Sequence, residues 1–474
     1  MTQEQFYNFI ISQFPYNPTN GQKALLFRLT RFIYTGVKNP LFIIKGYAGT
    51  GKTTIVSTLV KNLSTLNLNT VLLAPTGRAA KVLSSYSGKQ AFTIHKKIYM
   101  ANTAPDGSVR LVLGKNIHKN CIFFVDEASM IPDNNVSTDS SIFSGSSLLN
   151  DLIEFVYSGK NCKLVFIGDI AQLPPVNLDI SPALDIEYLK TSFSLTIGEY
   201  ELKEVVRQSL ESGILFNATT IRNKLDQKGF EGIIELDPFT DVFQINGELL
   251  EDALNDNFSG DMLENSVIIT RSNKRANIYN QELRNRILFR ENEISAGDLL
   301  MVVKNNYYWL DKKSQAGFIA NGDIVEILRI DQYEELYGYR FADVTIRMID
   351  YPDEKDLQVK IILDTISTDG PSLSQSESRA FFDEVMKDYE AIPMKRKRIE
   401  NVKNNPYFNS LQVKFAYALT CHKTQGGQWE NVFIDLGYLN KDHIDVSFYR
   451  WIYTAFTRAT NKLYLINFPE SFFK

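Results

Sequence analysis

Cysteine is scarce in this sequence, and long apolar segments, internal repeats, coiled-coil heptads and low-complexity tracts are all lacking. Cys121, Cys162 and Cys421 are too few and too scattered for a disulfide framework or a zinc site, which favours a reducing, cytoplasmic setting. No uninterrupted apolar run approaches the roughly 20 residues of a membrane span, and residues 1–5 open no signal peptide. We therefore expect no membrane association.

What the sequence does contain is the composition of an ordinary globular protein, with 474 residues of which 44% are hydrophobic and 22% charged. A chain of this length has room for roughly two to four domains. The net charge of −4 argues against a protein that is basic all over. It leaves open a protein with a local basic channel for nucleic acid.

Residues 46–53, Gly-Tyr-Ala-Gly-Thr-Gly-Lys-Thr, match the phosphate-binding P-loop pattern G-x-x-x-x-G-K-[ST]. The apolar run 41–44 before them predicts a buried parallel strand and residues 54–60 predict an amphipathic helix, flanks that a chance glycine-rich turn would lack. In such a loop the backbone amides surround an anion, Lys52 reaches the β- and γ-phosphates, and the hydroxyl of Thr53 is offered to Mg²⁺. The predicted nucleotide-binding residues of the loop are Gly49, Thr50, Gly51, Lys52, Thr53 and Thr54.

Strand-like apolar runs alternate with helical patterns through the first ~200 residues, which is the rhythm of a parallel α/β sheet. We place a first α/β domain at residues 1–190. Within it, a polar insert at 98–120 carries Asp106-Gly107 between two strand-like segments, which predicts a small β-hairpin. The expected strands of the first domain are 41–45, 70–74, 121–125 and 163–168.

A second α/β domain is expected at 191–295 and 411–474. Between its halves, residues 296–410 hold short strands, turns and a period-two pattern, which predict a small all-β barrel. A charged helix is expected to follow from Ser374 to Arg398; its basic run is interpreted either as a phosphate contact or as a solvated helix end. The expected strands of the second domain are 266–270, 412–419, 432–436 and 462–466.

Asp126 and Glu127 close the apolar strand 121–125, at the sheet edge where the P-loop is also expected. Asp126 can hold the Mg²⁺ shell, and Glu127 can orient and deprotonate the attacking water. Helix capping is the alternative for such a pair. Gln172 follows the next strand and is interpreted as a sensor of the triphosphate.

Three residues outside these strands complete the expected nucleotide site. Gln22 lies about one helix before the P-loop, and its amide can read the donor and acceptor edge of adenine, which favours ATP. Arg207 and Arg458, both in the second domain, can bring positive charge to the β/γ bridge from across a cleft. A solvated glutamine and surface salt bridges are the alternatives.

Nine segments occur in the order and spacing of a superfamily 1 DNA helicase, and the chain most resembles the RecD-like branch, superfamily 1B, which includes the Dda-type and PIF-type helicases. The segments are Gln22, GYAGTGKT, APTGRAAKVL, TIHK, VDEASM, GDIAQLPPV, LKEVVRQ, ALTCHKTQGGQW and YTAFTRA. The resemblance implies two RecA-like motor domains with ATP in the cleft, and single-stranded DNA that is translocated from 5′ to 3′. It also implies that the hairpin is a strand-separating wedge and that the β insert is an SH3-like domain over the DNA.

The candidate DNA-contacting residues lie where strands end and helices begin. Thr76 and the amides after it can bind phosphate, and Thr93 and His95 can contact backbone or base. A role in packing is the alternative for His95 and His422. The resemblance further implies that Gly427 takes part in nucleotide binding by linking DNA to the γ-phosphate. The candidate DNA-binding set is Pro75, Thr76, Arg78, Lys81, Thr93, His95, Thr420, His422 and Lys423.

We therefore expect an ATP- and Mg²⁺-dependent 5′-to-3′ DNA helicase that acts on single-stranded DNA and its junctions with duplex, as a monomer, in the cytoplasm at the nucleoid. An RNA helicase of the same superfamily and a non-translocating P-loop regulator are the alternatives. Because the chain ends soon after Arg458 and has no large amino-terminal extension, a minimal motor closer to the Dda-type and PIF-type proteins is expected. The segment 365–410 matches none of the motifs.

Overall fold

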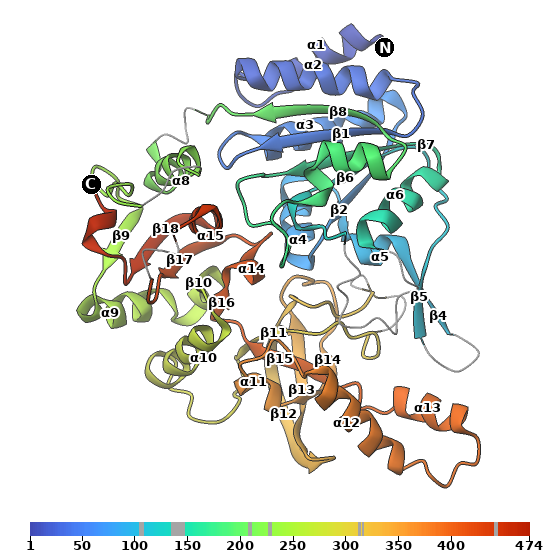
Figure 1. The fold of residues 1–474 in the computed structure, drawn as a ribbon, viewed down its shortest axis with the longest axis vertical. Coiled ribbons are helices and arrows are strands. Elements are labelled where there is room, and N and C mark those ends of the chain that lie inside the picture. The colour runs from blue at the N-terminus through green and yellow to red at the C-terminus, as the bar shows by residue number, and fades with distance from the viewer. Residues whose placement is uncertain are drawn as a thin grey trace.

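The computed structural model describes residues 1–103, 109–133, 147–206, 211–225, 230–310, 314, 317–439 and 444–474. Two parallel β-sheets, each flanked by helices, and one closed barrel make up the fold (Figure 1). In this view the first sheet lies at the top, the second at the left and the barrel below them. Within the described ranges, no helix has both the length and the apolar character that crossing a membrane requires.

The first sheet has the strand order β3-β2-β6-β7-β1-β8, and all its neighbouring strands are parallel. Its central strands bury both faces: Leu41 and Ile43 pack with α5–α7, while Phe42 and Ile44 pack with α1–α4. The sheet is therefore the middle of three layers. The bounds are α1 Gln3–Ser12, α2 Asn20–Tyr34, β1 Pro40–Gly46, α3 Lys52–Asn62, β2 Asn69–Ala74, α4 Gly77–Ser87, β3 Ala91–Thr93, α5 Ile94–Ile98, β6 Lys119–Val125, α6 Leu148–Ser158, β7 Lys160–Gly168, α7 Ile186–Ser192 and β8 Thr196–Leu202.

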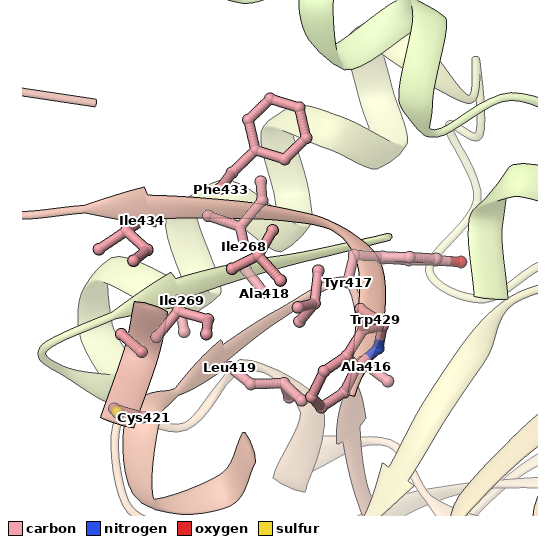
Figure 2. Packing of buried hydrophobic residues seen from close by; sticks show 14 of the residues in the cluster. Ile268, Ile269, Ala416, Tyr417, Ala418, Leu419, Cys421, Trp429, Phe433 and Ile434 are labelled. Atoms are coloured by element: carbon pink, nitrogen blue, oxygen red, sulfur yellow. The ribbon is translucent and has the colours of Figure 1, made fainter. Parts of the chain in front are cut away.

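The second sheet has the order β16-β10-β17-β18-β9 and is also parallel. Its core is apolar on neighbouring strands, as Ile268, Leu419 and Phe433 show in Figure 2. The bounds are α8 Gly213–Asn223, β9 Val242–Ile245, α9 Gly247–Asn257, β10 Ser266–Thr270, α10 Asn273–Glu282, β16 Ala418–Thr420, α14 Cys421–Thr424, β17 Trp429–Asp435, α15 Val446–Phe456 and β18 Ala459–Ile466.

Two smaller units interrupt the α/β domains. The hairpin β4–β5 lies between α5 and β6 and pairs Tyr99 with Leu113; the Asp106-Gly107 turn predicted at its tip lies outside the described residues. The barrel separates α10 from β16 along the chain. The bounds are β4 Tyr99–Thr103, β5 Val109–Leu113, β11 Leu299–Val302, β12 Ile324–Leu336, β13 Tyr339–Met348, β14 Leu357–Ile362, α11 Asp364–Ser367, α12 Gln375–Lys387, α13 Lys395–Lys403 and β15 Leu411–Phe415. Elsewhere in the chain, short 3-10 helices occupy 63–66, 128–130, 182–184, 260–265 and 470–472, and a π-helical segment occupies 283–287.

The predicted fold class, two parallel α/β domains with a hairpin insert and a barrel insert, is confirmed, but two of its boundaries need correction. β8, assigned to the second domain by the boundary at 190, pairs with β1 in the first sheet. It is a half-exposed edge strand, so its mixed polarity hides its membership in a parallel sheet. β15, assigned to the second domain by the boundary at 410, closes the barrel against β11.

The stretch expected as one strand at 412–419 is split between two sheets, because a bend at Ala416 and Tyr417 separates β15 from β16. Both halves are buried, so the apolar run shows no break. The charged helix expected from Ser374 to Arg398 is likewise two helices, α12 and α13. Pro393 lies between them and has no N–H to continue a helix.

Candidate active site

The P-loop connects β1 to α3, as its sequence predicts. Gly49 (φ 73°) and Gly51 (φ 82°) adopt the left-handed conformation that glycine takes without steric cost, and they turn the chain into the helix. The Lys52 ammonium, at the first residue of α3, donates to the carbonyls of Gly46 at 2.6 Å and Tyr47 at 2.9 Å. These two hydrogen bonds hold the Lys52 side chain against the backbone at the start of the loop.

Gln22 forms a hydrogen bond to the backbone of this loop. Its Nε2 donates to the Thr50 carbonyl at 3.1 Å, and its Oε1 accepts from the backbone N–H of Thr19 at 3.0 Å. A Cβ on Gly51 would lie 2.4 Å from that Nε2, so only glycine fits there. The amide is therefore engaged by the protein on both sides, and the adenine-reading role of Gln22 stays a prediction.

The two carboxylates lie at the end of β6, as predicted. Asp126 accepts from the Tyr86 hydroxyl at 2.5 Å and from the backbone N–H of Glu127 at 2.9 Å. Burial raises the pKa of Glu127, and the positive charges of Arg458 and Lys52 partly oppose this rise. A raised pKa brings a carboxylate closer to the range in which it accepts a proton efficiently near neutral pH.

One cavity of about 490 Å³ joins these groups, and we call it the ATP pocket after the nucleotide that the sequence predicts for it. Both α/β domains line it. The first domain contributes Gln22, Gly49, Gly51, Lys52, Thr53, Thr54, Asp126, Glu127 and Gln172, and the second contributes Ser212, Gln428, Thr457 and Arg458. Thr50 lies just behind this lining as a fully buried residue.

Arg458 reaches the pocket from the end of α15 and is 3% exposed. Its guanidinium donates to the carbonyls of Gly427 at 3.0 Å and Thr454 at 3.1 Å, and to the hydroxyl of Thr457 at 3.2 Å. No carboxylate forms a salt bridge with it in the described part of the chain, so its charge is directed at the pocket. The other predicted arginine, Arg207, lies outside the described residues.

Gln172 lies where the two domains meet. It is buried, and among the described residues its Oε1 has no hydrogen-bond partner. The next residue, Leu173, donates its N–H to Thr454 at 2.9 Å and accepts from Gln425 at 2.7 Å, both in the second domain. An unpaired buried carbonyl oxygen next to a domain junction is suited to respond to a ligand in the pocket.

Gly427 does not line the pocket, whereas its neighbour Gln428 does. A Cβ on Gly427 would lie 2.5 Å from the ring of Trp429, and that ring also carries the guanidinium of Arg78 at 3.9 Å. The Gly-Gly turn therefore packs against the first domain, where a Cβ on Gly426 would lie 3.1 Å from the Thr76 hydroxyl. The sequence prediction missed Gln428, although it follows the Gly-Gly pair directly.

The remaining candidates are the residues that the sequence predicts to contact DNA, and we call this set the DNA face: Pro75, Thr76, Arg78, Lys81, Thr93, His95, Thr420, His422 and Lys423. Thr76 and Thr93 cap α4 and α5, accepting from backbone N–H groups at 3.2 Å each. Pro75 directly precedes the α4 cap. Lys81 donates to the Ile349 carbonyl of the barrel at 2.8 Å. The structure thus places this side of the face against the barrel.

The second domain contributes the other side of the DNA face. Thr420 and His422 line one cavity of about 270 Å³. Lys423 donates to Asn321 of the barrel at 2.6 Å, and burial lowers its pKa to about 8. Burial also lowers the pKa of His422, and it lowers that of His95 to about 4. Both imidazoles are therefore neutral at pH 7.

Asp323, in the barrel, matches no motif and was not predicted as a site residue. It is 1% exposed, its Oδ1 has no hydrogen-bond partner within the described ranges, and a Cβ on Gly77 would lie 2.6 Å from that atom. Tyr351 of the barrel touches the same glycine. A barrel carboxyl group thus lies at the start of α4, beside Thr76. Burial raises its pKa to about 8.

Two family models match the chain. The one described as an AAA domain matches residues 34–231, which contain the P-loop and both carboxylates. The one described as a UvrD-like helicase C-terminal domain matches residues 415–466, which contain Arg458.

The ATP-dependent DNA helicase dda of Enterobacteria phage T4 is 28% identical over 302 residues, which are 61% of this chain and 62% of that protein. The ATP-dependent RecD2 DNA helicase of Deinococcus radiodurans is 28% identical over 175 residues, 37% of this chain and 21% of that protein. The crystal structure of the Pif1 helicase from Bacteroides with ADP-AlF3 and ssDNA covers 96% of this chain and 94% of its own at 14% identity, with a TM-score of 0.47. The matched regions span less than two thirds of both the dda and the RecD2 helicases.

Proposed function

We propose that the chain is an ATP-dependent superfamily 1B helicase of the RecD-like, Dda-type and PIF-type branch, and that it hydrolyses Mg-ATP to translocate from 5′ to 3′ on single-stranded DNA and separate duplex. One observation carries the proposal. Lys52 and Glu127 of the first domain line the same cavity as Arg458 of the second. Hydrolysis in that cavity therefore depends on the relative position of the two domains. A translocating enzyme needs this coupling between ATP hydrolysis and domain movement.

Each of the pocket residues has a different role in phosphoryl transfer. The carboxylate of Glu127 takes the proton of the attacking water, and the raised pKa that burial gives it suits this task. The cations of Lys52 and Arg458 stabilise the negative charge that grows on the phosphate oxygens. Gln172, with its unpaired Oε1, reports the presence of the γ-phosphate to the second domain.

The pocket also fits Mg²⁺. In the described part of the chain, no group of three or more His, Cys, Asp or Glu is placed to hold a metal by protein ligands alone. Mg²⁺ in nucleotide sites needs only one or two protein oxygens beside the phosphates and water. The hydroxyl of Thr53 and the carboxylate of Asp126 line the pocket and would hold it. Bound there, the ion supplies positive charge to the β- and γ-phosphates.

We assign the hairpin β4–β5 to strand separation. It lies in sequence between the Thr93/His95 segment of the DNA face and β6, which ends at the catalytic carboxylates. Replacing residues 102–113 with a short Gly-Ser turn is expected to abolish unwinding while translocation and ATP hydrolysis survive. Displacement of streptavidin from biotinylated single-stranded DNA measures translocation. Loss of all activities together would assign the hairpin to folding or DNA grip, and full unwinding would place the wedge elsewhere.

The proposal includes a monomeric motor, because one chain supplies both sides of the ATP pocket. It includes a substrate of single-stranded DNA and its junctions with duplex, and with it the cytoplasmic, nucleoid-associated location expected from the sequence.

Substrates with a tail on one strand test the direction of movement. We expect ATP-dependent unwinding of a duplex with a 5′ tail and none with a 3′ tail. Unwinding only from the 3′ tail would overturn the polarity, and unwinding of neither at saturating DNA would overturn the helicase assignment.

A further inference from the structure

A tyrosine hydroxyl connects the P-loop to the second domain. Tyr453 lies on α15 and is 1% exposed. Its hydroxyl accepts from the backbone N–H of Ala48 at 2.8 Å and donates to Oδ2 of Asp169 at 2.6 Å. One atom of the second domain therefore contacts the P-loop and the end of β7, both in the first domain.

Asp169 is suited to anchor this contact. It is 1% exposed, and its other carboxylate oxygen accepts from the backbone N–H of Ala171 at 2.9 Å. The position of the carboxylate is thus fixed by its own loop. Burial and the neighbouring Asp169 raise the pKa of Tyr453 well above its usual value, so the phenol keeps the proton that it donates.

The placement of Arg458 depends on α15. The partners of its guanidinium within the described residues are neutral: the carbonyls of Gly427 and Thr454 and the hydroxyl of Thr457. Thr454 and Thr457 lie on α15 or directly after it. Because no ion pair holds the guanidinium among the described residues, its position depends on the position of the end of α15.

We propose that Tyr453 is a positioning residue that fixes the end of α15 against the P-loop and thereby sets Arg458 in the ATP pocket. This inference rests on the proposed ATP hydrolysis in that pocket. Tyr453 itself is not among the residues that line the cavity, so its effect on hydrolysis passes through Arg458. The hydroxyl is the acting group, since a phenylalanine would fill the same buried space.

The test compares the steady-state ATPase of Tyr453→Phe, Arg458→Ala and the double variant, each with saturating single-stranded DNA. We expect Tyr453→Phe to lower kcat about tenfold with KM little changed, because a small misplacement of a charged group costs this much. In the Arg458→Ala background the same substitution is expected to have little further effect. Tyr464→Phe is the matched control: Tyr464 is buried in the same domain, its hydroxyl accepts from Nδ2 of Asn257 at 3.4 Å, and neither residue lines the pocket, so the loss of this hydroxyl should leave kcat unchanged.

A folded Tyr453→Phe variant with wild-type kcat overturns the proposal, and so does a loss that is as large in the Arg458→Ala background as in the wild type. Wild-type protein without ATPase activity would instead overturn the proposed function. Thermal unfolding checks that Tyr453→Phe is folded. Should it fail that check, Tyr453→Met, which also lacks the hydroxyl and adapts to buried space, takes its place in the same cycle.

Discussion

The ATP pocket and the DNA face differ in what their side chains contact. In the pocket, the described partners of Lys52 are two carbonyls of its own loop, and those of Arg458 are two carbonyls and a hydroxyl, so both charges face the cavity without an ion pair. On the DNA face, Lys81 and Lys423 bond to the barrel, and Asp323 of the barrel lies at the start of α4. Under the proposed function, ATP would therefore meet a formed site, whereas DNA would have to replace contacts within the protein.

The largest expected effect comes from Lys52→Ala, which removes a charge from the pocket alone. We expect kcat to fall by about 10²–10³-fold, because the ammonium stabilises the charge of the transition state. DNA affinity should stay within about twofold of wild type. Steady-state ATPase and fluorescence anisotropy with labelled DNA measure the two. A loss of kcat below about tenfold, or roughly 1.4 kcal/mol of barrier, would remove Lys52 from catalysis.

Glu127→Gln separates binding from hydrolysis within the pocket. The amide cannot take the proton of water, so we expect turnover to fall by about 10²-fold or more while ATP binds normally. Equilibrium binding of a fluorescent ATP analogue checks this. An equal loss of binding would assign Glu127 to structure. In the wild type, the raised pKa of Glu127 predicts that kcat falls as the pH is lowered and the carboxylate takes up a proton.

A smaller effect is expected from Thr76→Ala combined with Thr420→Ala on the DNA face. Losing two hydroxyl contacts to phosphate should weaken single-stranded DNA binding about tenfold, with basal ATPase unchanged. Because Thr76 also caps α4, its loss alone costs about 1 kcal/mol of stability. Thr76→Ser with Thr420→Ser keeps both hydroxyls and the cap, and it should bind as wild type does. Equal affinity of the alanine and serine pairs would remove these hydroxyls from DNA binding.

The smallest effect concerns the barrel contact and its dependence on pH. Burial and the nearby Asp350 raise the pKa of Asp323 to about 8, above the usual value of about 3.9. The carboxyl that is packed on α4 thus keeps its proton up to about pH 8, and the packing of the barrel on α4 weakens as the pH rises from about 3.9 to about 8. Tyr351 and the N–H of Ala320 also face the group.

Asp323→Asn mimics the protonated form at every pH, so the difference in DNA affinity between this variant and the wild type should grow as the pH rises from about 6 to about 8. At pH 9 the wild type should bind several-fold more tightly, because its barrel is released more easily. Anisotropy titrations of both proteins across this range provide the comparison. A ratio of affinities that stays constant with pH would show that Asp323 does not oppose DNA binding.

The sequence was most informative where chemistry depends on local pattern. The strand, loop and helix around Lys52, and the carboxylate pair after β6, were predicted at their observed places because each is set by neighbours in the chain. The two halves of the pocket were predicted to meet because phosphoryl transfer needs positive charge that Arg458 can bring from across a cleft, and the spacing of Arg458 in the chain does not by itself require this. The structure does not describe Arg207, so its role stays a prediction.

Contacts between distant segments could not be predicted in this way. Tyr453 lies within the same motif as Arg458, but helical spacing alone does not tell which of its side chains reaches the P-loop. Asp323 looks like an ordinary turn residue beside Gly322, and only the packing of the barrel on α4 places it next to Gly77. The membership of β8 in the first sheet was missed because an exposed edge strand lacks the apolar run of a central one.

Stimulation of ATP hydrolysis by single-stranded DNA is the most direct test of the central claim, that a formed ATP pocket is coupled to a DNA face closed by the protein itself. We predict slow hydrolysis by the protein alone, at least about tenfold faster hydrolysis with saturating single-stranded DNA, and a smaller response to RNA of the same sequence. Hydrolysis at the same rate with and without DNA would contradict the claim and favour a non-translocating ATPase. A larger response to RNA would replace DNA as the substrate.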